Sequence, residues 1–130
     1  MSRSALITGS SRGIGRAVAE ALAREGWPVC VNYLEHKGAA ESLVDLLRSE
    51  GRMAFRADVA DRAAVNEMVR AASETLGPVE LLVNNAGVAG QCLFQDITDA
   101  LWERYLGVNL GGARNAIQAV LPHMISEKRG

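Results

Sequence analysis

The stretch that decides the fold is Thr8-Gly9-Ser10-Ser11-Arg12-Gly13-Ile14-Gly15 (TGSSRGIG). It follows an apolar run at residues 4–8, which predicts a buried strand, and precedes apolar side chains that recur with helical spacing. A glycine-rich turn between a strand and a helix can bind a phosphate, because the start of the helix offers unpaired N–H groups and the positive end of its dipole. The stretch therefore predicts an anion-binding turn.

The same stretch permits a second chemistry. Residues 9–13 (GSSRG) also satisfy the G-x-S-x-G pattern of serine hydrolases, in which Ser11 would be the nucleophile. Such a site needs a histidine and an acid on later strand ends. We expect His36 just after the second strand and His123 near the end of the last helix, neither of them facing Ser11. We therefore favour the phosphate-binding turn, with Ser11 as a hydrogen-bonding residue; a hydrolase and a glycine turn without a ligand are the alternatives.

Strand and helix signals alternate along the whole chain. Apolar runs predict strands at residues 4–8, 29–33, 53–57 and 79–83. Helical spacing follows each of the first three strands, with Asp61 as the expected N-cap of the third helix. A long fourth helix should begin at Thr98 and reach about Ile125, although Pro122 should kink or interrupt its last turns. This alternation predicts one α/β domain over residues 1–130, with a doubly wound parallel sheet.

Composition and apolar runs argue against several classes of function. The chain has 130 residues with 14 Lys and Arg against 15 Asp and Glu, and this balance argues against a nucleic-acid-coating surface. No apolar run approaches the roughly 18 residues that a membrane span needs. The apolar stretch before the first glycine is too short for a signal peptide. Cys30 and Cys92 match no metal or redox spacing, so we expect reduced thiols. We expect a cytoplasmic protein that binds no membrane, metal or nucleic acid.

Four motifs occur in a family-like order: TGSSRGIG, Asp58-Val59 after the third strand, NNAG at residues 84–87 after the fourth, and Val108-Asn109 in the long helix. Together they resemble the short-chain dehydrogenase/reductase family, and within it most closely the 3-oxoacyl-[acyl-carrier-protein] reductase-like members. The resemblance spans the chain and implies the first four βα units of a Rossmann-like domain. It also implies an oxidoreductase that moves hydride between a nicotinamide dinucleotide and a carbonyl or alcohol.

The resemblance assigns site residues in four groups. The turn would hold the pyrophosphate and adenosine side of the cofactor through Gly9, Ser11, Arg12, Gly13, Ile14 and Gly15. The adenine would meet Asp58 and Val59, with the Asp58 carboxylate accepting a hydrogen bond from the exocyclic amine. The adenosine ribose would lie against Asn84, Ala86 and Gly87. Asn109 is assigned to the catalytic tetrad, where it would hold a water at a bend of the long helix.

Two charged residues bear on the choice between NADP(H) and NAD(H). Glu35 lies about 20 residues beyond the glycines, where a carboxylate would accept from the ribose 2′-OH of NAD(H). Glu35 lies beyond the expected end of its strand, however, whereas Arg12 resembles the basic residue that NADPH-using members place against the 2′-phosphate. A cation at a helix start opposes the dipole, which itself suggests an anionic partner. We favour NADP(H) over NAD(H).

The catalytic serine and the Tyr-x-x-x-Lys pair of the family would follow the long helix, beyond residues 126–130. Residues 33–37 (YLEHK) have the right spacing but follow the second strand, so we do not assign Tyr33 or Lys37 to catalysis. We therefore expect a cofactor-binding N-terminal half that is inactive by itself. The alternative is a non-catalytic dinucleotide-binding module or pseudoenzyme. Family members pair the long helix in homo-oligomers, and Trp102 and Leu106 are candidates for that contact.

Overall fold

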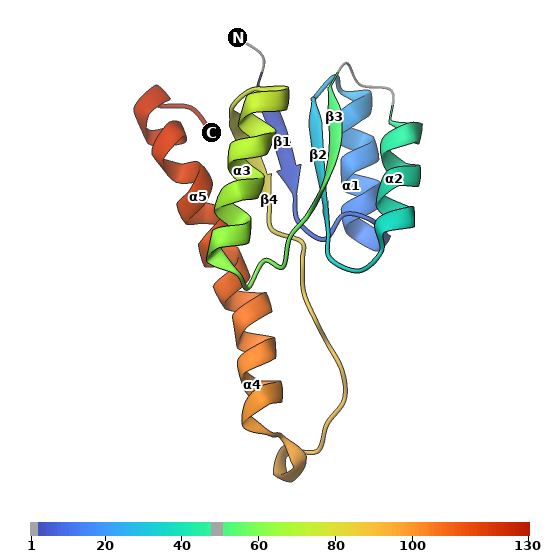
Figure 1. Cartoon of the computed structure of the whole chain (residues 1–130), viewed down its shortest axis with the longest axis vertical. Helices are drawn as coiled ribbons and strands as arrows, with labels where there is room; N and C mark the ends of the chain where they lie inside the picture. The colour runs from blue at the N-terminus through green and yellow to red at the C-terminus, as the bar shows by residue number, and fades with distance from the viewer. Residues whose placement is uncertain (1–2, 48–50) are drawn as a thin grey trace.

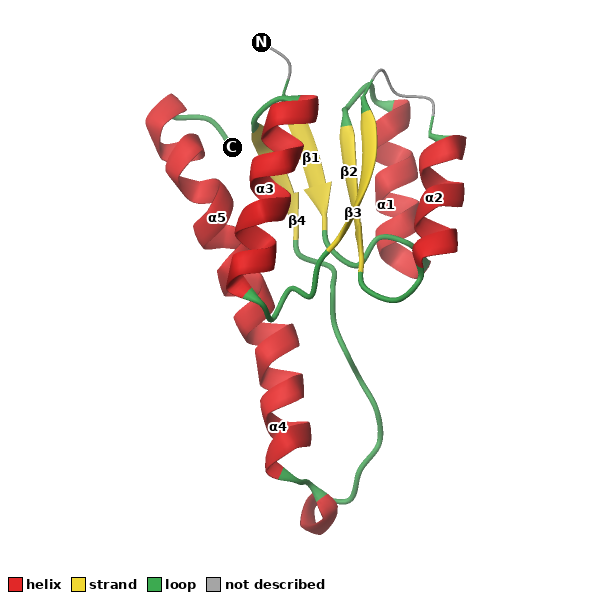
Figure 2. Ribbon diagram, viewed as in Figure 1, coloured by secondary structure: helices red, strands yellow, loops and turns green. Residues whose placement is uncertain are grey.

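A single parallel sheet forms the centre of the molecule. The structure, a computed structural model, describes residues 3–47 and 51–130. Its strands are β1 (Ser4–Ile7), β2 (Val29–Tyr33), β3 (Arg52–Arg56) and β4 (Val79–Val83), in the order β3-β2-β1-β4. All the pairings are parallel, which confirms the predicted sheet (Figure 2). β1 ends one residue earlier than predicted, and β3 lies one residue earlier at both ends, a difference within the usual uncertainty of strand boundaries.

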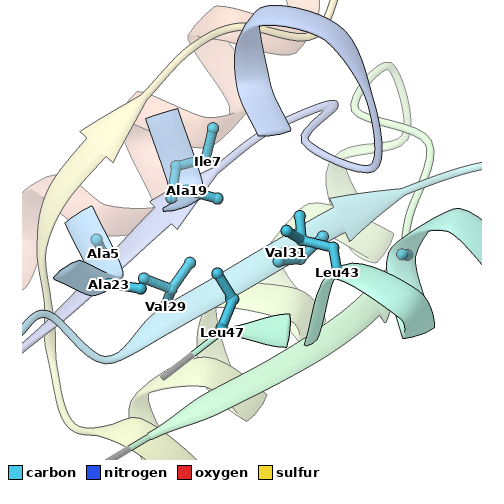
Figure 3. Close-up of a cluster of buried hydrophobic side chains, with 9 residues drawn as sticks. Ala5, Ile7, Ala19, Ala23, Val29, Val31, Leu43 and Leu47 are labelled. Carbon is cyan, nitrogen blue, oxygen red and sulfur yellow. The ribbon is translucent and has the colours of Figure 1, made fainter. Parts of the chain in front are cut away.

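Helices cover both faces of this sheet. α1 (Gly13–Arg24) and α2 (Lys37–Leu46) lie on one side, and α3 (Arg62–Leu76) and α5 (Gly112–Glu127) lie on the other (Figure 1). Successive strand residues point to opposite faces, so each face has its own apolar cluster. Figure 3 shows the cluster beneath α1 and α2, formed by Ala5, Ile7, Ala19, Ala23, Val29, Val31, Ala40, Leu43 and Leu47. The opposite cluster joins Leu6 and Cys30 to Met68, Ala72 and Val120.

Both cysteines are free thiols, as predicted. Cys30 is fully buried in β2, and this burial raises the pKa of its thiol to about 12. Cys92 is exposed in the loop that follows β4. Because a thiol reacts as its thiolate, Cys30 is a packing residue rather than a nucleophile.

The predicted helix starts are confirmed by their side-chain caps. The Asp61 carboxylate accepts a hydrogen bond from the Ala64 N–H at 3.2 Å, and α3 begins immediately afterwards. The Thr98 hydroxyl accepts one from the Leu101 N–H at 3.1 Å, and α4 (Asp99–Leu106) begins there. Each bond satisfies one of the N–H groups that a helix start leaves without a partner.

The long helix is irregular around Asn109, where the family resemblance implied a bend, and not at Pro122. α4 passes through a π-helical turn, η2 (Gly107–Gly111), into α5, and the backbone stays helical at both junctions. Pro122 lies inside α5, which continues to Glu127, so of the two effects predicted for Pro122, a kink or an interruption of the last turns, the interruption is wrong. Pro122 and Gln118 are both exposed, and water can therefore reach the carbonyl that the missing proline N–H leaves unpaired.

α4 extends beyond the sheet as an arm. It projects past the end to which the β1 arrow points, beside the loop that descends from β4 and contains the short helix η1 (Phe94–Asp96) (Figure 1). Every residue from 91 to 100 is exposed, including Phe94 with 86% of its surface accessible. No helix within the described residues is long and apolar enough to cross a membrane.

Candidate dinucleotide-binding site

A cavity of about 350 Å³ opens at the carboxyl ends of the strands. Ligands of doubly wound sheets bind at this edge, where neighbouring connections leave the sheet in opposite directions. Here β1 has β2 on one side and β4 on the other, and loops from all four strands reach the cavity. Its lining residues are Gly9, Ser11, Arg12, Gly13, Asn32, Tyr33, Leu34, Glu35, His36, Ala57, Asp58, Val59, Asn85, Ala86, Gly87, Val88, Arg104 and Val108.

The glycine turn is close-packed against the loop that follows β4. Gly9 has φ +59°, and a Cβ there would lie 2.8 Å from the Ala86 Cα. A Cβ at Gly15 would lie 2.8 Å from the Gly9 carbonyl oxygen and would also collide with the Asn85 amide. The atoms that a Cβ at Gly15 would meet belong to the glycine turn and to the loop that follows β4. A side chain at either position would push the turn away from its neighbours.

The first turn of α1 has no capping side chain. Its N-cap, Arg12, has an extended backbone (φ −154°, ψ 173°) and makes no side-chain cap hydrogen bond, and the turn holds no acidic residue. The N–H groups that begin α1 are therefore left for an external acceptor, and the positive end of the helix dipole adds to their attraction for an anion. The glycine turn lies between β1 and α1, as predicted, and anion binding there stays a prediction.

Asn85 fastens the β1 and β4 loops together. Its side-chain amide donates to the carbonyl oxygens of Thr8 at 3.1 Å and Gly9 at 2.9 Å. The Thr8 hydroxyl oxygen in turn accepts from the backbone N–H groups of Asn85 and Ala86, both at 3.0 Å. Asn84 is exposed and lies outside the cavity lining, whereas its neighbour Asn85 lines the cavity. Sequence reasoning did not single out Asn85; two adjacent asparagines give no sign of which one turns inward.

Two side chains of the long helix bind the loop that follows β3. Arg104 of α4 forms an ion pair with Asp58, with 2.7 Å between Nη1 and Oδ2. The side-chain amide of Asn115 donates to the carbonyl oxygen of Val59 at 2.9 Å. A Cβ at Gly112 would lie 2.5 Å from the Val59 Cγ2, so α5 approaches this loop as closely as only glycine allows. Gly107 and Gly111, in the same helix, have only ordinary van der Waals neighbours at this position.

The charged residues that bear on cofactor choice both line the cavity. Arg12 and Glu35 are exposed, and neither has an ion-pair partner among residues 3–47 and 51–130. Their side chains are therefore available to a ligand. Ile14 is 78% exposed and, like Gly15, lies outside the lining.

His36 lies in the same cavity as Ser11, so the expectation that it would face elsewhere is wrong. Residues 34–36 of the β2–α2 loop line the cavity, and His36 is the last residue before α2. The structure gives no hydrogen bond between these two side chains in the part of the chain it describes. The serine with an internal role is Ser10, whose hydroxyl donates to the Ile7 carbonyl oxygen at 2.7 Å. Tyr33 lines the cavity, while Lys37 lies outside the lining, at the start of α2.

Asn109 joins the π-helical turn to the β4 loop. Its Oδ1 accepts from the Val88 N–H at 2.8 Å, and its Nδ2 donates to the Val88 carbonyl oxygen at 2.9 Å. The side chain does not serve its own helix backbone. Asn109 lies outside the cavity lining, next to Val108, which is part of it. Such π-helical turns are frequent at functional sites.

The doubly wound sheet and the uncapped glycine turn define a Rossmann-like α/β protein. A family model described as short chain dehydrogenase matches residues 3–130, and the chain belongs to this family. It is 40% identical over 132 residues to the 3-oxoacyl-[acyl-carrier-protein] reductase FabG of Staphylococcus epidermidis, covering 100% of this chain and 54% of that protein. It is also 40% identical over 129 residues to the 2,3-dihydro-2,3-dihydroxybenzoate dehydrogenase of Bacillus subtilis, with 97% and 49% covered.

Solved structures agree with this assignment. A blue fluorescent protein from a metagenomic library, in complex with NADPH, superimposes with a TM-score of 0.86 at 36% identity, covering 93% of this chain and 50% of that one. A mutant short-chain dehydrogenase/reductase of Serratia marcescens gives 0.88 at 33% identity, with 94% and 50% covered. The chain spans about half the length of the curated relatives it matches.

Proposed function

We propose that residues 1–130 form the NADP(H)-binding part of an oxidoreductase that interconverts a carbonyl and an alcohol, with a 3-oxoacyl thioester as the substrate class. The observation that carries the proposal is the uncapped start of α1 beside the close-packed glycine turn. Membership of the short-chain dehydrogenase family and the NADPH complex of one structural neighbour support it.

The residues present fit a dinucleotide. The free N–H groups at the start of α1 suit a pyrophosphate, and the hydroxyl of Ser11, a buried residue in the lining of the cavity, can donate to the same group. Asp58 and Val59 offer an acceptor and an apolar wall to the adenine, and Ala86 and Gly87 leave room for the ribose to approach the backbone. When bound, the cofactor would supply or accept the hydride. Asn109 would act by holding a water near the reacting groups, and its two bonds to Val88 would keep the π-helical turn in place for that task.

The preference for NADP(H) depends on Arg12. A guanidinium without a carboxylate partner can pair with a 2′-phosphate, whereas the Glu35 carboxylate would repel that group and accept from a 2′-OH. Arg12 lies at the phosphate-binding turn itself, and we therefore give it the greater weight.

The test is titration of the chain with NADPH and with NADH, before and after Arg12→Gln. We expect the substitution to weaken NADPH binding about tenfold or more and to change NADH binding much less, since a charge-assisted hydrogen bond is worth about 1.5–3 kcal/mol. Arg24→Gln, at the other end of α1 and outside the cavity, is the matched control. Equal weakening of both dinucleotides would refute the NADP(H) preference, and binding of neither by the unmodified chain would refute the proposed function.

We further propose that the chain by itself turns over no carbonyl substrate and that the complete enzyme is a cytoplasmic homo-oligomer. The competing function is a dinucleotide-binding module without catalysis. NADPH-dependent reduction of a 3-oxoacyl thioester by the purified 130-residue chain would contradict the proposed inactivity. A longer reading frame carrying a serine and a Tyr-x-x-x-Lys pair would favour the enzyme over the module.

A further inference from the structure

The Asp58 carboxylate is fixed at both of its oxygens. Oδ1 accepts from the Ala60 N–H at 3.0 Å, and Oδ2 pairs with the Arg104 guanidinium at 2.7 Å. Asp58 and Arg104 are 46 residues apart in the sequence, and both line the cavity. The Ala60 N–H belongs to the same loop as Asp58, whereas Arg104 belongs to α4. Arg104 is therefore the partner that fixes the orientation of the carboxylate relative to the rest of the cavity rim.

This ion pair is too exposed to be explained by stability. The side chains of Arg104 and Asp58 are 42% and 32% exposed, and pairs of this kind contribute about 0–1 kcal/mol. A fixed carboxylate at a cavity rim can instead select a ligand group. An ionised carboxylate only accepts hydrogen bonds, and each of its oxygens has a second lone pair that Ala60 and Arg104 leave free.

We propose that Arg104 is a positioning residue for purine recognition: it holds Asp58 so that a free lone pair accepts from a 6-amino group and disfavours a 6-oxo group. The inference rests on the proposed dinucleotide site and extends it to a residue of α4. An amine placed against this carboxylate gains a charge-assisted hydrogen bond, whereas a carbonyl oxygen there meets another acceptor. Arg104 also neutralises a negative charge beside a site meant for an anionic ligand.

The experiment compares NADPH with its hypoxanthine analogue, in which the 6-amino group is replaced by an oxo group. The dissociation constants of the 130-residue chain for the two compounds give a selectivity ratio, which a general loss of stability would not change. We expect the unmodified chain to prefer NADPH and Arg104→Gln to reduce the ratio about three- to tenfold, the scale of one hydrogen bond. Arg114→Gln is the control, because Arg114 is exposed on α5 and lies outside the cavity.

A second variant tests whether Arg104 acts through Asp58. Asp58→Asn keeps the shape but can also donate to a 6-oxo group, so its ratio should fall to about one or below. In that background Arg104→Gln should change the ratio no further. The inference would be overturned if Arg104→Gln left the selectivity ratio unchanged, or if Arg104→Gln still altered the ratio in the Asp58→Asn background. Equal binding of the two compounds by the unmodified chain would overturn it as well. Binding of neither compound would refute the proposed function as well.

Discussion

At the scale of a single residue, Gly15 lies where the glycine turn leaves no room for a side chain. The atoms that crowd it are the Gly9 carbonyl oxygen and the Ser10 Cα, at 2.8 and 2.9 Å from an added Cβ, together with the Asn85 amide that ties β1 to β4. Backbone atoms cannot rotate away as a flexible side chain can, so one added methyl group must move the turn itself.

We predict that Gly15→Ala lowers the free energy of unfolding by about 1–3 kcal/mol, the usual cost of overpacking. It should also weaken nucleotide binding, because the displaced turn carries the N–H groups at the start of α1. The measurement is urea denaturation, with binding of NADPH as a second readout. Gly38→Ala in α2 is the control: a Cβ there meets nothing within 4 Å, so the same change should stabilise the chain by up to about 1 kcal/mol. Equal effects at the two positions would contradict this interpretation.

At the scale of elements, the π-helical turn contacts the β4 loop through neighbouring side chains. Asn109 offers one acceptor and one donor to the backbone of Val88, and Val108 belongs to an apolar cluster against which Ala86 and Val88 pack. Asparagine suits the position because its amide provides both groups at once.

We predict that Asn109→Ala exposes the Val88 amide to hydrogen exchange and destabilises the chain by about 0.5–1.5 kcal/mol for the bonds lost. Asn109→Asp keeps the acceptor for the Val88 N–H and loses the donor to its carbonyl oxygen, so protection of that amide should be retained. The measurement is amide exchange at Val88 by NMR. Unchanged exchange in the alanine variant would show that the loop is held by other contacts.

The elements that sequence reasoning predicted well are those specified locally. Strand runs were found from their apolar residues, and the starts of α3 and α4 from Asp61 and Thr98, because a cap bonds within three residues of itself. The π-helical turn at residues 107–111 has no comparable local signal; only the family resemblance implied a bend there, at Asn109. The effect of Pro122 was overestimated, because it depends on exposure, which one sequence does not reveal.

The site was predictable to the extent that its residues follow strand ends in order. The turn at residues 9–13 and Asp58-Val59 both reach the cavity. Other site residues depend on the paths of the loops: Asn85 rather than Asn84 lines the cavity, and so does His36. Arg104 reaches the site from a helix that is distant in sequence. Hydrophobic periodicity carries no information about such contacts.

On the scale of the whole molecule, the long helix leaves an apolar surface uncovered. Six large apolar side chains, each at least 41% exposed, share one face of the path from α4 to α5: Trp102, Leu106, Leu110, Ile117, Leu121 and Ile125. Two series recur at four-residue intervals, one from Trp102 to Leu110 in α4 and η2 and one from Ile117 to Ile125 in α5. α4 extends past the sheet, so much of this surface has no counterpart in the described chain (Figure 1). A continuous apolar surface of this kind favours association.

We predict that the 130-residue chain self-associates through this face and that Leu110→Lys combined with Leu121→Lys makes it monomeric, since two charges would have to be buried in the contact. Both side chains are exposed, at 68% and 41%, so the free energy of unfolding of the monomer should change little. Sedimentation velocity over a range of concentrations measures the outcome. Ser42→Lys with Asn66→Lys makes the same change in net charge at exposed positions of α2 and α3, outside the apolar face, and this control should associate like the unmodified chain. If both double variants sediment alike, general charge rather than the helix face governs association, and the open edge of β4 becomes the surface to test.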